Sequence, residues 1–286
     1  MKSVNVALIG CGYWGSKLKR YIEEDDSFYL VKVSNSKTDL NEVWQDTTLP
    51  AVVVATPMAT HYGIVKAALL AGKSVLCAKP LALKTAECEE LKELAEERGL
   101  PLLVGYTWTF SRALQQAKTI VKGRQIGKVL GFFLITRQWG RFGRENVYWL
   151  LASHLLSILD MFLPIAGFSF SPTELVCRND KIESALLSFK GEGVVGQLDV
   201  SINYPGKEFS VAVYGEEGTI VYNPLTAPCL RLERYDGKKE QCFIDESNNL
   251  ALAIKAFGQM LHGNKEGNVA RAVAVTRVIE GLGLDK

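Results

Sequence analysis

The first 120 residues alternate between short apolar runs and longer segments with helical periodicity. Five runs are predicted to be strands: residues 4–10, a continuous apolar run typical of a strand buried on both faces, and residues 29–35, 51–57, 74–79 and 101–107. The clearest helical segments are 58–72 and 85–99, the second with Thr85 as a candidate N-cap and Gly99 as a candidate stop. This alternation predicts parallel strands joined by crossover helices, a doubly wound α/β sheet of the Rossmann type.

The pattern changes after residues 111–127. Polar and apolar residues alternate with a period of two, between turn residues, at 183–190, 193–204, 209–215, 218–223 and 230–236. Such alternation is typical of an antiparallel sheet with one covered face and one more exposed face. Two helical patterns, 249–263 and 268–282, close the chain. We therefore predict two domains, residues 1–120 and an α+β domain of residues 121–286 with a mainly antiparallel sheet.

Composition and charge exclude several classes of protein. Of 286 residues, 48% are hydrophobic and 22% charged, the balance of a folded soluble protein, and the net charge of +2 gives no nucleic-acid footprint. The six cysteines form no CxxC pair, which favours reduced cytoplasmic thiols and no metal site. Residues 148–168 are long enough to span a membrane but contain His154, Asp160 and Pro164, so a buried soluble helix is expected and no membrane partner.

A G-x-G-x-x-G spacing stands at the end of the first predicted strand, where a helix begins. It comprises Gly10, Gly12 and Gly15, with Tyr13 and Trp14 between the last two. In this context the first glycine allows a tight turn, the second lets a pyrophosphate approach the backbone, and the third permits close packing of helix and strand. The motif predicts a dinucleotide site at residues 10–15, although a plain tight turn would also use these glycines.

The end of the second predicted strand bears on the choice of cofactor. NAD-binding sheets usually carry an acidic residue there, to hold the ribose hydroxyls. This chain has Asn35 instead, flanked by Ser34, Ser36 and Lys37. No carboxylate repels a 2′-phosphate, and hydroxyl, amide and ammonium groups can receive one, which favours NADP over NAD. The alternative is a polar turn without a binding role.

Several motifs in order carry a resemblance to a known family. These are residues 7–15 (ALIGCGYWG), 52–83 (VVVATPMATHYGIVKAALLAGKSVLCAKPLAL), 102–114, 123–132, the hairpin at 211–223, and 149–156 (WLLASHLL) after 137–149 (RQWGRFGRENVYW). Together they resemble the Gfo/Idh/MocA family of NAD(P)-dependent oxidoreductases over the length of the chain. The resemblance implies a dinucleotide-binding domain at 1–120 and a substrate-binding and oligomerisation domain at 121–286.

The same resemblance assigns roles to particular residues. Lys79 corresponds to the catalytic lysine beside the nicotinamide and the substrate, with Pro80 fixing its turn. His154 corresponds to the active-site histidine. Thr56, Pro57 and His61 are expected to line the cofactor. From the residues alone, Lys79 also follows a buried strand at the edge where α/β sheets bind ligands, and burial there would lower a lysine pKa toward acid/base use.

Candidate substrate-binding residues cluster before the histidine. The segment 137–149 holds three arginines and two tryptophans, which suits a hydroxylated ring, a carboxylate or a phosphate-bearing substrate. An exposed basic loop is the equal alternative. The residues predicted to contact substrate are Lys79, Trp108, Arg137, Asn146, Trp149 and His154.

Three positions depart from the family pattern. Ala78 stands where the family has the acid of its E-K-P motif, and Leu150 and Leu155 replace the two acids around the histidine. On a helix, positions i and i+4 face each other, so an acid at 150 would orient and stabilise a charged imidazole at 154. Without it, His154 is expected to be neutral and a weaker base.

These observations predict an NADP-preferring oxidoreductase acting on a sugar, a nucleotide-linked sugar or a related hydroxylated ring. Lys79 would exchange the hydroxyl proton, assisted by His154, while hydride moves to or from the nicotinamide. Two alternatives stay open: a cofactor-binding sensor or assembly subunit with a decayed site, and a reductase of another substrate such as an imine. The family resemblance also implies a homodimer or homotetramer formed through the sheet of the second domain.

Overall fold

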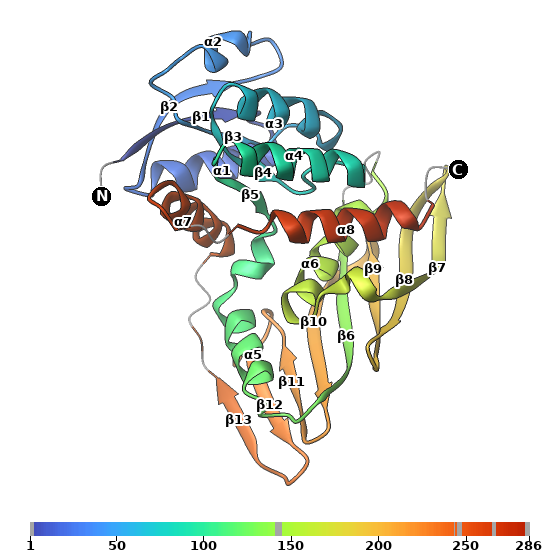
Figure 1. The fold of residues 1–286 in the computed structure, drawn as a ribbon. Helices are drawn as coiled ribbons and strands as arrows, with labels where there is room; N and C mark the ends of the chain where they lie inside the picture. The colour runs from blue at the N-terminus through green and yellow to red at the C-terminus, as the bar shows by residue number, and fades with distance from the viewer. Residues whose placement is uncertain (1–2, 141–144, 243, 245–247, 265–266, 284–286) are drawn as a thin grey trace. The chain divides into compact units, whose positions relative to one another are not determined.

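A computed structural model describes residues 3–140, 145–242, 244, 248–264 and 267–283 (Figure 1). The chain divides into two compact units, one of residues 1–107 and 248–280, the other of residues 108–247 and 281–286. This division differs from the predicted domains, 1–120 and 121–286. Residues 108–120 belong to the second unit, and the last two helices return to the first.

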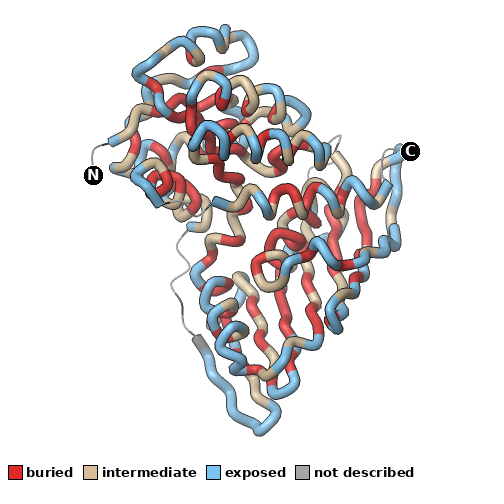
Figure 2. Tube along the Cα trace, viewed as in Figure 1, coloured by how far each residue is buried: buried red, intermediate tan, exposed pale blue. Residues whose placement is uncertain are grey.

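The first unit is built on a parallel sheet, as predicted. Its strand order is β2-β1-β3-β4-β5, and every adjacent pair is parallel. The strands are β1 (Val4–Ile9), β2 (Phe28–Ser34), β3 (Ala51–Val54), β4 (Ser74–Ala78) and β5 (Leu102–Gly105). The central strands β3 and β4 are almost wholly buried, which explains their continuous apolar sequence (Figure 2).

Helices cover both faces of this sheet, as a doubly wound fold requires (Figure 1). The helix α1 packs against α7, and Phe28 stacks on Phe257 of α7 with ring centroids 6.0 Å apart. The helices α3 and α4 pack against each other. The helical elements of this unit are α1 (Tyr13–Glu23), α2 (Asn41–Trp44), η1 (Met58–Thr60), α3 (His61–Leu70), α4 (Thr85–Glu97), α7 (Asn249–Leu261) and α8 (Val269–Gly281).

Polar side chains fasten the C-terminal helices to the first unit. The amide of Asn268 accepts from the backbone N–H of Val104 at 2.8 Å and donates to its carbonyl at 2.7 Å, as a neighbouring strand would. The Glu280 carboxylate accepts from the backbone N–H of Thr85 at 2.9 Å. Since α4 begins at Thr85, this residue is not the N-cap that the sequence predicted. The carboxylate of Glu280 from α8 caps the helix instead.

The second unit holds an eight-stranded sheet of order β13-β12-β11-β10-β6-β9-β8-β7. It is antiparallel except for the pair β6 and β9, which confirms a mainly antiparallel sheet. Its strands are β6 (Val129–Trp139), β7 (Ser169–Arg178), β8 (Lys181–Gly191), β9 (Val194–Ser201), β10 (Asn203–Gly215), β11 (Gly218–Tyr222), β12 (Leu230–Arg234) and β13 (Lys239–Cys242). The alternation of residues had not identified β6, β7 or β13.

Helices cover one face of this sheet. Phe162 of α6 lies 5.7 Å from Phe132 of β6 between ring centroids, so α6 packs on the face that holds Phe132. The helical elements here are η2 (Thr107–Phe110), which begins at the unit boundary, α5 (Arg112–Lys122), the π-helical turn η3 (Tyr148–Ala152), α6 (Ser153–Phe162) and η4 (Ile165–Gly167). Across both units, no helix in the described part of the chain has the length and hydropathy to cross a membrane.

Candidate functional site

The glycine loop lies at the point in the first sheet where the strand order reverses. Strand β2 lies on one side of β1 and β3 on the other, and open α/β sheets bind ligands outside the carboxyl ends of the strands at such a point. Gly10 has φ +91°, and a Cβ there would lie 2.7 Å from the carbonyl oxygen of Ala55. Gly10 is therefore required by the turn and by the close approach of β3.

Gly12 differs from its neighbours because the chain itself does not require it. A Cβ at Gly12 would meet nothing within 4 Å, whereas a Cβ at Gly15 would lie 2.1 Å from the oxygen of Gly10. Gly12 directly precedes α1, and the N-terminus of a helix carries the positive end of its dipole. Gly12 is exposed and its backbone is open to the close approach of a phosphate group, so the loop is suited to a dinucleotide.

Lys17, which was not predicted from the sequence as a site residue, lies beside the glycine loop. The Lys17 ammonium donates to the Tyr13 hydroxyl at 2.9 Å and lies 4.3 and 4.9 Å from the ring centroids of Tyr13 and Trp14. Both rings are about half exposed, at 50% and 54%. The i,i+4 spacing of Tyr13 and Lys17 on a helix could have identified the lysine. Lys17 adds positive charge at the start of α1.

Residues 34–38 form a compact polar turn after β2. The Asn35 side-chain oxygen accepts from the backbone N–H of Lys37 at 2.9 Å, and Thr38 Oγ1 accepts from the N–H of Asn35 at 3.0 Å. Asn35, Ser36 and Lys37 are exposed. Ser34 is fully buried, and its hydroxyl has no hydrogen-bond partner in the described structure. The exposed groups that can receive a phosphate are therefore those of residues 35–37, without Ser34.

The carboxyl ends of β3 and β4 carry the next predicted residues. Thr56 and Pro57 follow β3, and the Thr60 hydroxyl lies 2.8 Å from Thr56 Oγ1 and 2.7 Å from the Pro57 carbonyl. Lys79 follows β4 directly, is half-buried, and is joined to Pro80 by a cis peptide. Since β3 and β4 are adjacent and parallel, these turns lie at the same sheet edge as the glycine loop.

His61 lies buried between the turns that follow β3 and β4. Its side chain is buried, with Nδ1 2.6 Å from the carbonyl oxygen of Pro80 and Nε2 2.9 Å from that of Thr56. The pKa of the imidazole is lowered, chiefly by burial. The two carbonyls raise this pKa and the charge of Lys79 lowers it further. Both ring nitrogens face the backbone, so His61 supports the cofactor edge from within.

The helical segment with His154 begins in a π-helical turn. The Asn146 side-chain oxygen accepts from the backbone N–H of Tyr148 at 3.0 Å, and the Ser153 hydroxyl donates to the carbonyl of Trp149 at 2.7 Å. His154 is half-buried, as are Asn146, Trp149 and Leu150, whereas Leu155 is fully buried in the core. Burial raises the pKa of Tyr148 to about 12, so its phenol stays protonated at neutral pH.

Arg137 lies on the opposite face of the sheet from the histidine helix. Thr136 pairs with Phe209 and Arg137 with Glu208, so alternation directs Arg137 away from the face that α6 covers. Its guanidinium makes a bidentate ion pair with Asp199, which raises its pKa. The contact of Arg137 with substrate stays a prediction, and this register places its side chain on the other face of the sheet from Phe132. Arg141 and Arg144, the other two arginines of that segment, lie outside the described residues.

Trp108, by contrast, lies on the covered face. Its ring stacks on Phe209 with centroids 4.1 Å apart and an interplanar angle of 27°. It is half-buried, so one part of the indole stays accessible. Within the second unit, Trp108, Phe209 and α6 therefore share one face of the sheet.

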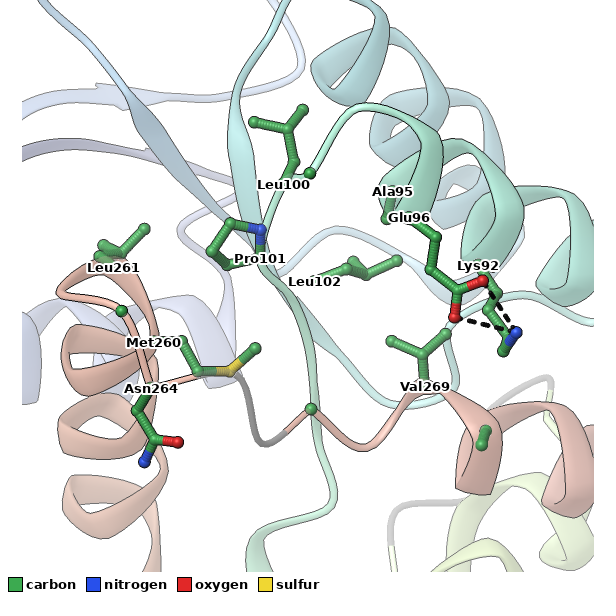
Figure 3. Close-up of a pocket in the computed structure, with 14 residues that line it drawn as sticks. Lys92, Ala95, Glu96, Leu100, Pro101, Leu102, Met260, Leu261, Asn264 and Val269 are labelled. Carbon is green, nitrogen blue, oxygen red and sulfur yellow. Dashed lines mark hydrogen bonds and ion pairs between the residues drawn. The ribbon is translucent and has the colours of Figure 1, made fainter.

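A hollow of about 640 Å³ in the first unit lies away from these residues (Figure 3). It is lined by the end of α4, the start of β5, and the facing ends of α7 and α8, with the ion pair of Lys92 and Glu96 at its rim. Because Leu102 is the first residue of β5, this hollow lies at the amino edge of the sheet. The cofactor loop is at the opposite, carboxyl edge.

The fold and the glycine loop define a two-unit protein with a Rossmann nucleotide-binding unit. Residues 31–106 match the family model described as an oxidoreductase family with an NAD-binding Rossmann fold (GFO_IDH_MocA). This match confirms, over residues 31–106, the resemblance drawn from the sequence.

Curated relatives and a solved structure extend the comparison. A dTDP-3,4-didehydro-2,6-dideoxy-alpha-D-glucose 3-reductase from Streptomyces violaceoruber is 29% identical, over 82% of this chain and 70% of its own length. A 2,7-anhydro-N-acetylneuraminate hydratase from Mediterraneibacter gnavus is 31% identical, over 46% of this chain and 38% of its own length. The matched part of this chain thus spans little more than a third of that relative.

A 3-ketoreductase from Actinomadura kijaniata, solved with TDP-benzene and NADP, has the same fold. It superposes with a TM-score of 0.84 at 18% identity, covering 96% of each chain. At this identity the likeness shows the fold of the chain. The family description of residues 31–106 names NAD binding, which supports a nicotinamide cofactor.

Proposed function

We propose that this protein is a nicotinamide-dependent oxidoreductase acting on a sugar, a nucleotide-linked sugar or a related hydroxylated ring. The observation that carries the proposal is the open space beside Gly12, at the start of α1 and at the reversal point of a parallel sheet. The sugar-nucleotide substrate of the Streptomyces violaceoruber reductase supports the substrate class.

Lys79 is the proposed acid/base. It follows β4 at the sheet edge that holds the glycine loop, where its ammonium or amine can reach a substrate hydroxyl. A bound nicotinamide supplies the hydride acceptor or donor. In oxidation Lys79 takes the hydroxyl proton, and in reduction it returns a proton to the carbonyl oxygen. His154 is proposed to assist this proton exchange, and Trp108, Asn146 and Trp149 are proposed to contribute to substrate binding.

The cofactor is proposed to be NADP. Exposed Asn35, Ser36 and Lys37 offer an amide, a hydroxyl and an ammonium, and no carboxylate occurs at positions 34–38. An ammonium and neutral donors favour a 2′-phosphate, whereas a carboxylate at this point selects the ribose hydroxyls of NAD.

We further propose a homodimer or homotetramer formed through the open face of the eight-stranded sheet. Leu130, Val195 and Tyr214 are exposed by 45%, 60% and 42%, and they line one shallow apolar hollow. Exposed apolar patches of this kind mark association surfaces. The cysteine pattern supports a cytoplasmic location for the assembly.

The test of this function is single-turnover hydride transfer with Lys79→Ala, using UDP- and dTDP-sugars with NADP⁺ and the corresponding keto sugars with NADPH. Lys79→Ala should abolish transfer and leave the Kd for NADPH close to that of the wild type, since the glycine loop is unchanged. Lys84→Ala, at an exposed lysine near the same edge, should transfer hydride normally. Wild-type transfer by Lys79→Ala would refute the assignment.

A second candidate is a cofactor-binding protein that gives no net redox change. Leu150, Leu155 and Ala78 lack the carboxylates of the family pattern, and one relative is named a hydratase. Nicotinamide absorbance and product mass should therefore be followed together. A gain of one water without a change in absorbance would favour a hydratase, and tight cofactor binding without any product would favour a sensor or assembly subunit. Imine substrates belong in the same panel.

A further inference from the structure

One buried imidazole connects the two turns at the cofactor edge of the first sheet. His61 is 1% exposed, and its ring lies between the carbonyl oxygens of Thr56, after β3, and Pro80, after β4. These turns carry the proposed cofactor-lining residues and the proposed catalytic lysine. They are 23 positions apart in the sequence (Pro57 and Pro80), and strand pairing between β3 and β4 ends before either turn.

The geometry of the ring makes this connection rigid. An imidazole is planar, with its two nitrogens at a fixed separation, so contacts of 2.6 Å and 2.9 Å fix the spacing of the two carbonyls. His61 is also the first residue of α3, which packs on β3 and β4. The side chain is thus anchored by its own helix while it spans both turns.

We propose that His61 is a positioning residue that sets the spacing between the Thr56–Pro57 turn and Lys79. This role rests on the proposed function, because it concerns how the cofactor and the acid/base are placed. The His61 side chain is buried and both of its ring nitrogens face backbone carbonyls. Its effect passes through two backbone carbonyls, that of Thr56, which precedes Pro57, and that of Pro80, which follows Lys79.

The charge around the ring is consistent with this role. Lys79 is the charged group whose field acts on the imidazole, and the other polar groups at the ring are the two carbonyls. A neutral imidazole has one N–H and donates to one carbonyl only, whereas an imidazolium donates to both. The number of carbonyls to which His61 donates therefore depends on its protonation, and the charge of Lys79 acts on that protonation.

The experiment compares His61→Leu and His61→Gln with the wild type, using NADPH as the probe. The readouts are the Kd and the emission of bound NADPH, measured well below each unfolding temperature. Leucine donates to neither carbonyl, so the Kd should rise about tenfold, equivalent to about 1.4 kcal/mol, and the emission of the bound nicotinamide should shift. Glutamine retains N–H donors and should recover the Kd to within about threefold of the wild type.

The control is His262→Gln, since His262 is an exposed histidine at the end of α7, and it should bind NADPH as the wild type does. Wild-type Kd and emission in His61→Leu would overturn the proposal, even if its unfolding temperature falls. If the leucine variant does not fold, a Kd in His61→Gln raised about tenfold or more would overturn it instead, because glutamine keeps the N–H donors. Failure of the wild-type protein to bind NADPH or NADH would refute the proposed function, and this role with it.

Discussion

Gly15 packs so closely on Gly10 that a Cβ atom at Gly15 would lie 2.1 Å from the Gly10 carbonyl oxygen. Gly12, between them, faces open space, and its φ of −76° is accessible to any residue. The three glycines of one motif therefore serve two purposes. Gly10 and Gly15 are needed by the fold, and Gly12 is needed only if a ligand approaches.

This difference predicts that Gly15→Ala and Gly12→Ala behave oppositely. Gly15→Ala should lower the unfolding temperature, because α1 has to move away from the loop. Gly12→Ala should keep the unfolding temperature within about 1 °C, yet weaken NADPH at least about tenfold, because the new methyl group occupies the phosphate space. Thermal unfolding and fluorescence titration measure both effects. Unchanged NADPH affinity in Gly12→Ala would place the cofactor elsewhere.

Lys37 is predicted to select NADP. Lys37→Glu replaces an exposed ammonium with a carboxylate beside the expected 2′-phosphate, and the loss of one charged hydrogen bond is worth about 1.5–3 kcal/mol. The ratio of NADPH to NADH affinity should therefore fall by at least about tenfold. Lys122→Glu, at an exposed lysine of α5, is the matched charge reversal and should leave the ratio unchanged. An unchanged ratio in Lys37→Glu would leave residues 34–38 as a plain polar turn.

His61 predicts a dependence of stability on pH. Its pKa is lowered from the ordinary 6.5, so the unfolded state binds a proton at a higher pH than the folded state does. Stability gained from this residue is present above pH 6.5 and is lost as the pH falls through the folded-state pKa. Between about pH 7 and pH 5.5, the free energy of unfolding measured in urea should therefore fall more for the wild type than for His61→Gln. Parallel losses in the two proteins would contradict the burial of a neutral imidazole.

Val195 is predicted to lie in a subunit interface. Its side chain is 60% exposed on an open sheet face, and Val195→Asp would place a charge in a buried apolar contact. The variant should sediment as a monomer at micromolar concentration, where the wild type is a dimer or tetramer. Leu225→Asp is the control, since Leu225 is an apolar residue exposed by 47% in the loop between β11 and β12. A monomeric wild type would refute the interface.

Much of the fold could be predicted from the sequence because local pattern and tertiary environment agree. The buried parallel strands are continuous apolar runs such as residues 51–54, and the glycine spacing falls where strand meets helix. The sheet of the second unit was recognised where its strands alternate. Strand β6 was not, because its run from Leu130 to Ile135 is almost continuously apolar and lacks the period of two.

The remaining features depend on contacts between distant residues. No local pattern shows that Asn268 would complete the edge of β5 through Val104, which brings the last helices to the first unit. The ion pair of Arg137 and Asp199 depends on the parallel register of β6 and β9. The sequence alone could not predict it, because the two residues are far apart in the chain. The place of His61 between two carbonyls likewise arises only when β3 and β4 are adjacent.

The central claim is that the glycine loop binds a nicotinamide dinucleotide. Its most direct test is a fluorescence titration of the purified protein with NADPH and, separately, with NADH. Saturation with both, and tighter binding of NADPH, is the predicted result. Tighter binding of NADH would keep the enzyme proposal and reject Lys37 as the selecting residue. Binding of neither cofactor would contradict the account as a whole.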